Sequence, residues 1–321
     1  DAVFAALKIM KNNRGKRVRQ ILLDFRNAFF QFPVDPDEQR FFATRLKNNI
    51  FIWTRCVQGS RGAPLVCGRA LALAMRLCFG LVDGDRASSS TYVDDPLSTY
   101  GGTDEEQTDA ICLTTAGLLA LGYDLSFDKA QDSADGPVTW TSGKLEILHD
   151  QEVIKVQVKD DIVDEVRLTV DDMLKARTIP LKSLRTLAGQ ATCTASLLHA
   201  WRPFVSMIWA PLYDAKARCW WEPDSVWQKP VAIALKWMAA FLHKQCGSLI
   251  RIYKLSDYMG EGSLVEVVTD ASPTGLGAYL VEDDVIQEYF GDFITENDEH
   301  VLGTWKGTCE GQQVWEALSV L

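Results

Sequence analysis

Tyr92-Val93-Asp94-Asp95 places two adjacent carboxylates between two short runs of residues that favour β-strands. The first run covers residues 88–91, and the second covers residues 96–100 before Gly101-Gly102 ends it. This pattern predicts a strand, a turn and a second strand, with the acids at the tip. Adjacent carboxylates repel each other unless a cation lies between them, and Mg²⁺ is the usual cation beside phosphates.

The same four residues also fit an ordinary solvated turn, because Asp is common at the tips of hairpins. A short string of one aromatic residue, any residue and two acids therefore does not by itself separate a metal site from a turn. The choice between these two interpretations depends on the sequence that surrounds the string.

The whole chain has the composition of a globular protein. Its 321 residues are 47% apolar and 24% charged, and this length is enough for two or three domains. The eight cysteines form no Cys-x-x-Cys pair, so we interpret them as reduced thiols of an intracellular protein, in the cytoplasm or nucleus. The sequence has no signal peptide and no apolar run that could cross a membrane, so we expect no membrane partner.

Charge is divided unevenly along the chain. The net charge is −10, yet residues 1–82 contain 14 Lys and Arg against 5 Asp and Glu, a net of +9. Between Glu38 and Asp83 there are seven Lys or Arg residues and no acid. This asymmetry predicts that the N-terminal part binds a polyanion, and the alternative is a solvated basic face.

The order of the predicted elements in the first half indicates an α+β fold with an antiparallel sheet and helices on one face. Besides the acidic hairpin, we expect helices over 2–11, 65–81 and 105–121, a strand over 18–23, and hairpins over 41–51 (turning at Asn48-Asn49) and 138–147. Asp24 directly follows the apolar strand. An acid at this position lies at the edge of a sheet, where metal ligands are usual, although Asp also serves as a helix N-cap.

The predicted secondary structure of the second half differs from that of the first. Residues 164–246 are helix-rich, and their Trp side chains either pack in a core or stack on bases. From Ser263 we expect strands over 264–270 (buried), 275–281 and 285–290, and then a helix from Val314. Asp270 on the first strand and Glu316 on the helix suit metal-assisted hydrolysis, although Glu316 also fits a helix-dipole role.

Taken in this order, the motifs resemble a reverse transcriptase of the retroviral and LTR-retrotransposon type. The similar segments are Leu23-Asp24-Phe25-Arg26-Asn27-Ala28-Phe29, Gln58-Gly59-Ser60-Arg61-Gly62, Tyr92-Val93-Asp94-Asp95, residues 122–129 and, more loosely, 140–145. Residues 184–189 are similar to the thumb, and residues 269–278 with 315–318 are similar to the start of a ribonuclease H domain. The resemblance implies a polymerase palm over 1–150, a helical thumb or connection over 151–262, and a partial ribonuclease H-like domain over 263–321.

The resemblance also implies a role for each matching residue. Phe29 would be the steric gate that excludes a 2′-hydroxyl, and Lys129 would be the acid for the departing pyrophosphate. The metal ligands for Mg²⁺, or for Mn²⁺ in its place, would be Asp24, Asp94 and Asp95. The residues that contact the nucleotide or template would be Gln58, Gly59 and Arg61. The partners would be an RNA or DNA template–primer and a dNTP, and Asp270 with Glu316 would be ribonuclease H acids.

The sequence departs from the family pattern in two places. Asn27 stands where Asp is usual, at a position that contacts the nucleotide mainly through the backbone. Pro96 replaces an apolar strand residue after the acid pair, which removes a backbone N–H from the hairpin. From the resemblance we also expect the fingers strands before Asp1 and further ribonuclease H acids after Leu321, as in a fragment of a retroelement polyprotein.

Three functions follow from these observations. The first is an RNA-directed DNA polymerase that uses two metal ions. The second is a retroelement remnant that binds nucleic acid without catalysis, which Asn27, Pro96 and both expected truncations favour. The third is a metal-dependent nuclease centred on Asp270 and Glu316, which two acids alone support poorly, so we expect no useful ribonuclease H activity.

Overall fold

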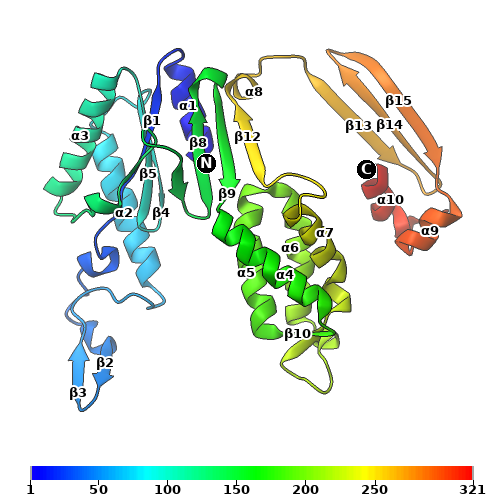
Figure 1. The fold of residues 1–321 in the computed structure, drawn as a ribbon, viewed down its shortest axis with the longest axis horizontal. Coiled ribbons are helices and arrows are strands. Elements are labelled where there is room, and N and C mark those ends of the chain that lie inside the picture. Colours follow the sequence, from blue (N-terminus) through cyan, green and yellow to red (C-terminus); the bar gives the residue numbers. More distant parts are fainter. Residues whose placement is uncertain (1, 320–321) are drawn as a thin grey trace. The chain divides into compact units, whose positions relative to one another are not determined.

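The computed structural model describes residues 2–319, which form two compact units divided between Met259 and Gly260 (Figure 1). Both units combine helices with antiparallel sheets, so the α+β class predicted from the sequence is confirmed. The finer division at residues 150 and 262 stays a prediction. Among the described residues, no helix is long and apolar enough to span a membrane.

The first sheet carries the acidic hairpin. Its strands are antiparallel and lie in the order β4-β5-β1-β6. Their bounds are β1 (Val18–Leu22), β4 (Ala87–Tyr92), β5 (Asp95–Gly101) and β6 (Gln131–Asp132). Strands β1 and β5 are the inner pair and are mostly buried, so the residues at their ends are attached to a packed core.

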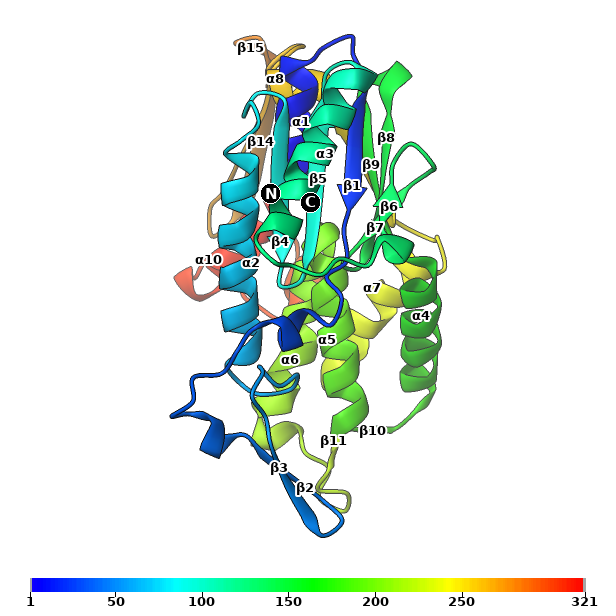
Figure 2. The ribbon, with the colours of Figure 1, turned by 90° about the vertical axis from the view of Figure 1, so that its left-hand side faces the viewer.

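Helices cover this sheet. Helices α2 (Ala63–Phe79) and α3 (Asp104–Ala120) pack on the face that presents Ile21 and Tyr100. Helix α1 (Ala2–Asn12) packs against Leu97, which points to the opposite face because side chains alternate along a strand. The expected layer of helices on one face therefore holds for α2 and α3, and α1 adds a helix on the other face (Figure 2).

A second antiparallel sheet follows, with its strands in the order β12-β9-β8-β7. Their bounds are β7 (Val138–Trp140), β8 (Gly143–Leu148), β9 (Val153–Val158) and β12 (Ile250–Lys254). Leu145 and Ile154 of this sheet share one apolar core with α1 and with Leu97 of the first sheet. The two sheets are therefore tied together through α1.

The helix-rich segment forms a bundle beside the second sheet (Figure 1). Its helices are α4 (Asp160–Lys175), α5 (Leu181–Leu197), α6 (Arg202–Tyr213) and α7 (Ala232–Leu242). Trp201 is fully buried in the core of this bundle, as the packing interpretation predicts, whereas Trp220 is 81% exposed. The short strands β10 (Thr178–Pro180) and β11 (Ser225–Trp227) pair with each other, and α8 (Leu255–Met259) ends the unit.

A separate hairpin lies within the basic segment and carries two of its seven cations, Arg45 and Lys47. It consists of β2 (Ala43–Leu46) and β3 (Asn49–Ile52), and all of its residues are exposed. The turn is Lys47-Asn48, so the predicted turn at Asn48-Asn49 is wrong by one residue. The reason is that Lys47 adopts the left-handed conformation, with φ of 55°, which allows Leu46 to pair with Asn49.

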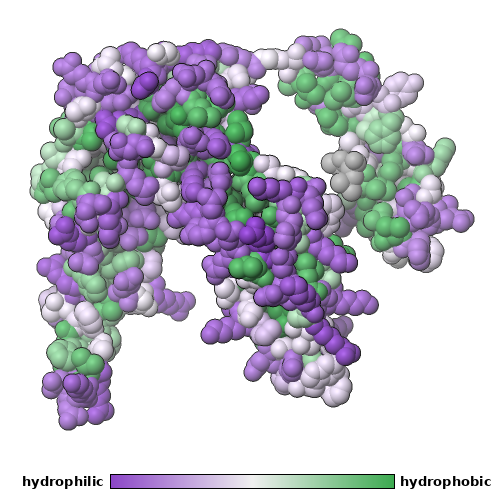
Figure 3. All heavy atoms as spheres, in the orientation of Figure 1, coloured by the Kyte–Doolittle hydropathy of each residue, from purple (hydrophilic) through white to green (hydrophobic). Residues whose placement is uncertain are grey.

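The second unit is a three-stranded sheet with two helices. Its elements are β13 (Val265–Ala271), β14 (Gly275–Glu282), β15 (Val285–Phe293), α9 (Glu296–Leu302) and α10 (Gln312–Ser319). Trp315 of α10 is buried against Ala271 and Leu276, at one end of the sheet. The prediction that the first strand is buried is wrong, because α10 covers only this end and apolar side chains remain at the surface (Figure 3).

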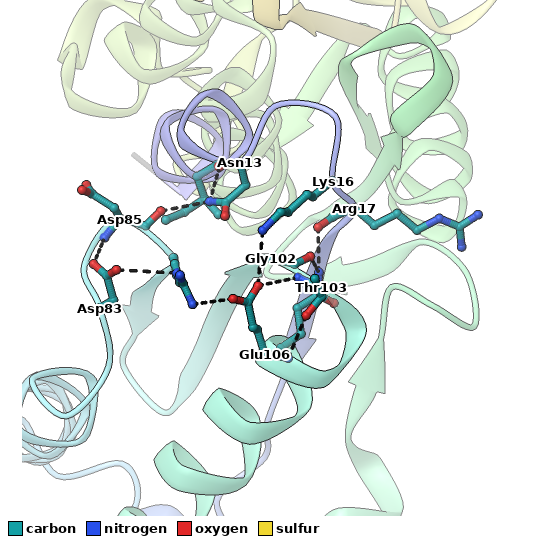
Figure 4. Close-up of polar contacts among 11 residues, drawn as sticks. Asn13, Lys16, Arg17, Asp83, Asp85, Gly102, Thr103 and Glu106 are labelled. Carbon is teal, nitrogen blue, oxygen red and sulfur yellow. Dashed lines mark hydrogen bonds and ion pairs between the residues drawn. The ribbon is translucent and has the colours of Figure 1, made fainter.

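A polar network joins the beginnings and ends of several elements in the first unit (Figure 4). The Glu106 carboxylate accepts a hydrogen bond from the Thr103 amide at 2.8 Å, while the Thr103 hydroxyl caps the Glu106 amide, so α3 begins with a capping box. The same carboxylate pairs with Arg86 at 2.8 Å and with Lys16 at 3.4 Å. These contacts attach α3 to the segments that begin β4 and β1.

Candidate active site

The acidic hairpin has the geometry that its sequence predicts. Tyr92 pairs with Asp95, so Val93 and Asp94 are the two turn residues. Val93 has φ of 55°, a left-handed conformation that costs a β-branched residue about 1–2 kcal/mol. Gly68 of α2 lies against this turn, since a Cβ atom on Gly68 would stand 3.6 Å from the Val93 Cα. Helix α2 therefore supports a strained turn, and a side chain larger than Ala at position 68 would displace it.

Asp24 lies beside the hairpin tip. Strand β1 pairs with β5 up to Leu22 and Leu97, and the same register continued by two residues brings Asp24 opposite Asp95. The Asp24 carbonyl accepts a hydrogen bond from the Ser126 amide at 2.8 Å. Asp24 and Asp95, which are 71 positions apart in sequence, thus lie at the same end of the sheet.

Lys129 contacts Asp24 directly. Its Nζ lies 3.2 Å from Oδ2 of Asp24, and it ends a short 3₁₀-helix over Phe127–Lys129. The structure therefore brings together two residues that the sequence singled out for separate reasons. The N-cap alternative for Asp24 is wrong, because Asn27 occupies the N-cap position of the next helical turn, without a side-chain cap hydrogen bond.

Electrostatics link the three carboxylates. Burial raises the pKa of Asp95, and the charges of Asp94 and Asp24 raise it further. Lys159, which immediately precedes α4, acts in the opposite direction and lowers the pKa of Asp95. Burial, with the Asp94 charge as a smaller cause, also raises the pKa of the Cys67 thiol to about 12. The hairpin tip is thus a region of concentrated negative charge with two nearby lysines.

This donor set fits a hard divalent cation in its chemistry. Carboxylate oxygens are the ligands that Mg²⁺ prefers. The pKa of Asp95 is raised first by burial and then by repulsion from Asp94 and Asp24, and a cation relieves this second cause. The ammonium group of Lys129 already supplies one positive charge at Asp24. Over residues 2–319, however, no three His, Cys, Asp or Glu side chains are gathered closely enough to hold a metal ion. Asp24, Asp94 and Asp95 therefore have suitable donor atoms but are not gathered into a three-ligand site in this arrangement, and their role as metal ligands stays a prediction.

Phe29 lies on a 3₁₀-helix that follows Asp24. The helix spans Ala28–Gln31 and begins after Asn27, whose φ of 51° is a left-handed conformation that Asn tolerates well. Phe29 is half-buried and packs against the core beneath α2 and α3. The Gln31 side chain donates to the Asp124 carbonyl at 2.9 Å and accepts from the Asp124 amide at 3.0 Å. This pair of hydrogen bonds fixes the 3₁₀-helix to the segment that leads to Lys129.

The predicted nucleotide-contacting loop lies just before α2. Gly59 has φ of 91°, which favours glycine, and Gln58 and Arg61 are exposed. No hydrogen bond between described residues joins either of these two side chains to the carboxylates. The contacts predicted for Gln58, Gly59 and Arg61 therefore stay predictions.

The basic segment around this loop retains unneutralised charge. Near α1 and α3, Arg86 and Lys16 both form ion pairs with Glu106. In contrast, none of the seven cations between Glu38 and Asp83 has a carboxylate within 4.0 Å among the described residues; they are Arg40, Arg45, Lys47, Arg55, Arg61, Arg69 and Arg76. Their charge is available to an anionic partner.

The second predicted acid pair is arranged differently. Gln312 of α10 donates from Nε2 to the Ala271 carbonyl at 2.5 Å and to Oε1 of Glu316 at 2.9 Å. Because strand side chains alternate, Asp270 points to the sheet face opposite Ala271, and Ala271 packs on α10. Among described residues no hydrogen bond connects Asp270 with Glu316, and their joint role stays a prediction.

Comparison with known proteins gives a structural match. No protein-family model and no curated protein matches the chain. A foamy viral protease-reverse transcriptase in complex with double-stranded DNA is similar with a TM-score of 0.51 and 17% identity, over 89% of this chain and 45% of that one. The foamy viral protease-reverse transcriptase in complex with an RNA/DNA hybrid is similar with a TM-score of 0.51 and 16% identity, over 98% of this chain and 37% of that one.

The chain has a reverse-transcriptase-like fold. It spans less than half the length of either of these solved structures, and identities this low show the fold alone. Within this reverse-transcriptase-like fold, the residues that sequence reasoning missed are those that support others: Gln31, Gly68, Lys159 and Gln312. The sequence gives little indication of these four residues, because each acts on a residue that is distant in the sequence.

Proposed function

We propose that the chain is the catalytic part of a reverse transcriptase, an RNA-directed DNA polymerase that transfers a nucleotide from a dNTP to a primer 3′-hydroxyl. One observation carries the proposal: Asp24, Asp94 and Asp95 share one sheet end, with Lys129 on Asp24, inside a reverse-transcriptase-like fold. The neighbours with this fold are described in complex with double-stranded DNA or an RNA/DNA hybrid, which supports the same class of partner.

The chain's own residues have distinct tasks in this proposal. Asp24 and Asp94 would hold two Mg²⁺ ions, and Asp95 would assist as a ligand or charge partner. When bound, these ions would lower the pKa of the primer hydroxyl and stabilise the leaving pyrophosphate. Lys129 would donate a proton to that pyrophosphate. Its contact with Asp24 supports this task, because it holds the ammonium group beside the carboxylates.

Substrate selection would depend on the neighbouring segments. Phe29 would exclude the 2′-hydroxyl of a ribonucleotide, and Gln58, Gly59 and Arg61 would contact the incoming nucleotide and the template. The seven cations without carboxylate partners would neutralise template–primer phosphates, so binding would weaken steeply as salt rises. Mn²⁺ would serve as a substitute for Mg²⁺, since it accepts the same oxygen ligands.

A second candidate is a protein with the same fold that binds template–primer without catalysis. Pro96 favours it, because this residue interrupts the pairing of β5 with β1 next to Asp95. The two candidates share their binding surface and differ only at the carboxylates. They are therefore separated by measuring binding and extension on the same sample.

The test uses a fluorescent DNA primer annealed to a poly-ribonucleotide template. Anisotropy reports binding, and gel analysis reports extension in Mg²⁺ and, separately, in Mn²⁺. The polymerase proposal predicts salt-sensitive binding together with extension in at least one metal. Binding without extension in either metal would favour the second candidate, and absence of binding would contradict both.

A further inference from the structure

The tip of the acidic hairpin lacks one main-chain hydrogen bond. The Leu23 amide donates to the Pro96 carbonyl at 3.4 Å, in the register that places these two residues opposite each other. In such an antiparallel pair, both residues normally exchange an N–H and a carbonyl. Pro96 has no N–H, so it cannot donate to the Leu23 carbonyl, and the regular β1–β5 pairing ends at Leu22 and Leu97, two residues from Asp95.

A side chain from the other sheet makes contact at this point. The indole Nε1 of Trp140 donates to the main-chain carbonyl of Asp95 at 2.9 Å. Trp140 is the last residue of β7, and its ring packs against the core that α1 shares with both sheets. The contact joins residues that are 45 positions apart, and it reaches the residue adjacent to the missing ladder bond.

The donor is presented from a rigid support. Strand β7 pairs with β8, and the Thr139 amide donates to the Gln131 side chain at 2.7 Å, which attaches β7 to the first sheet. The Ser142 carbonyl, in the turn after Trp140, accepts from the Lys159 amide at 3.1 Å. An indole that is held from both sides can fix the position of the group to which it donates.

We propose that Trp140 is a positioning residue, whose indole N–H holds the Asp95 main chain in place of the ladder hydrogen bond that Pro96 cannot make. Two observations from different elements support it: the interrupted pairing at Pro96 and the indole contact one residue away. The structural role of Trp140 stands without any assumption about activity. Its consequence for catalysis rests on the proposed polymerase function.

Hydrogen exchange measured by mass spectrometry tests the role without requiring activity. The measured peptide covers residues 91–97, and the variants are Trp140→Phe, Pro96→Val and the double variant. Phe keeps most of the ring packing and removes only the donor. Pro96→Val restores an N–H that faces the Leu23 carbonyl and suits a strand. Trp209→Phe is the matched control, because the Trp209 indole also donates, to Thr192 at 3.1 Å in the helical bundle.

The proposal predicts that Trp140→Phe speeds hydrogen exchange at the hairpin tip by about five- to tenfold. This factor corresponds to the net free energy of about one hydrogen bond. Trp209→Phe should leave this peptide unchanged. In the Pro96→Val background the effect of Trp140→Phe should shrink to about twofold or less, because the ladder bond then supports the tip. Equal effects in both backgrounds, or no effect in either, would overturn the proposal.

Kinetics then test the catalytic consequence separately. If the chain extends primers, Trp140→Phe should lower kcat while KM for dNTP changes little, and Pro96→Val should restore part of the loss. A rise in KM with unchanged kcat would contradict a positioning role. If the wild-type chain does not extend primers, the exchange result still decides the structural claim, so the two failures are distinguishable.

Discussion

The Nζ atom of Lys129 lies 3.2 Å from Oδ2 of Asp24, which places a positive charge beside a carboxylate that lies two residues after the inner strand β1. Asp24 is also one of the charges that raise the pKa of Asp95. Lys129 is 65% exposed in its side chain, so it can move between Asp24 and a bound anion without leaving a buried charge. The ion pair therefore holds both residues at the place where we propose that they act in catalysis.

Replacing Lys129 with Gln should reduce primer extension by about 100-fold, the usual range for loss of a general acid. Template–primer affinity should change by less than about twofold, since the charge of Lys129 is already paired with the Asp24 carboxylate. Single-turnover extension and anisotropy measure the two effects. Lys175→Gln, which removes an exposed ion pair with Asp172 on α4, is the control. Equal extension by Lys129→Gln and wild type would contradict the proton-donor role.

Replacing Phe29 with Val should allow ribonucleotide incorporation, because a smaller side chain leaves space for a 2′-hydroxyl. The comparison is the ratio of kcat/KM for dNTP to that for rNTP, which should fall by about tenfold or more. Phe30→Val is a matched control from the same 3₁₀-helix, since Phe30 stacks on Trp53 instead. An unchanged ratio in Phe29→Val would remove the steric-gate assignment.

The ionised carboxylate of Asp95 should lower the free energy of unfolding at neutral pH. Its pKa is raised in the folded state by burial and by Asp94 and Asp24, so its protonated form favours folding and stability falls as pH rises through that pKa. Asp95→Asn should therefore raise the melting temperature by about 1–3 °C at pH 7. The gain should shrink towards pH 4, near the ordinary pKa of about 3.9.

Thermal melts from pH 4 to pH 8 measure this difference. Asp128→Asn is the control, because Asp128 is exposed and lies outside the carboxylate cluster. A lower melting temperature for Asp95→Asn at pH 7, or a gain that does not depend on pH, would show that charge repulsion at the hairpin tip is not the cause.

Reversing a charge in the basic segment should weaken template binding. Arg61→Glu or Arg69→Glu removes a cation that has no carboxylate partner among the described residues, so the salt dependence of log K should lose about one unit of slope. Lys8→Glu makes the same charge change on the exposed side of α1 and should have a smaller effect. If all three variants bind alike, the basic segment is not the path of the template.

The sequence predicts the local parts of the site well, because they depend on nearby residues. The acid pair after a polar run and before a Gly-Gly indicates the hairpin, and the apolar strand before Asp24 indicates an acid at a sheet edge. The register of β1 against β5 then brings Asp24 opposite Asp95. That pairing could be expected from the resemblance but not from either motif alone.

Other features depend on packing between distant elements and leave little local signal. Trp140 contacts the main chain of Asp95, and the charge of Lys159 lowers the pKa of Asp95. Both residues are brought near the hairpin by the core that α1 shares with the two sheets. Gly68 matters because α2 lies against the turn at Val93, which no pattern within α2 reveals. The error in β13 has a similar origin, since an apolar run predicts burial only if another element covers it, and α10 covers one end.

The most direct test of the central claim is primer extension by wild type, Asp94→Asn and Asp270→Asn, each at saturating template–primer and dNTP with Mg²⁺. Loss of a metal-ligand carboxylate at the hairpin tip should reduce the rate by roughly a thousandfold, while the second-unit variant Asp270→Asn should extend like wild type. Extension by Asp94→Asn at the wild-type rate would contradict the claim that the hairpin carboxylates carry the chemistry.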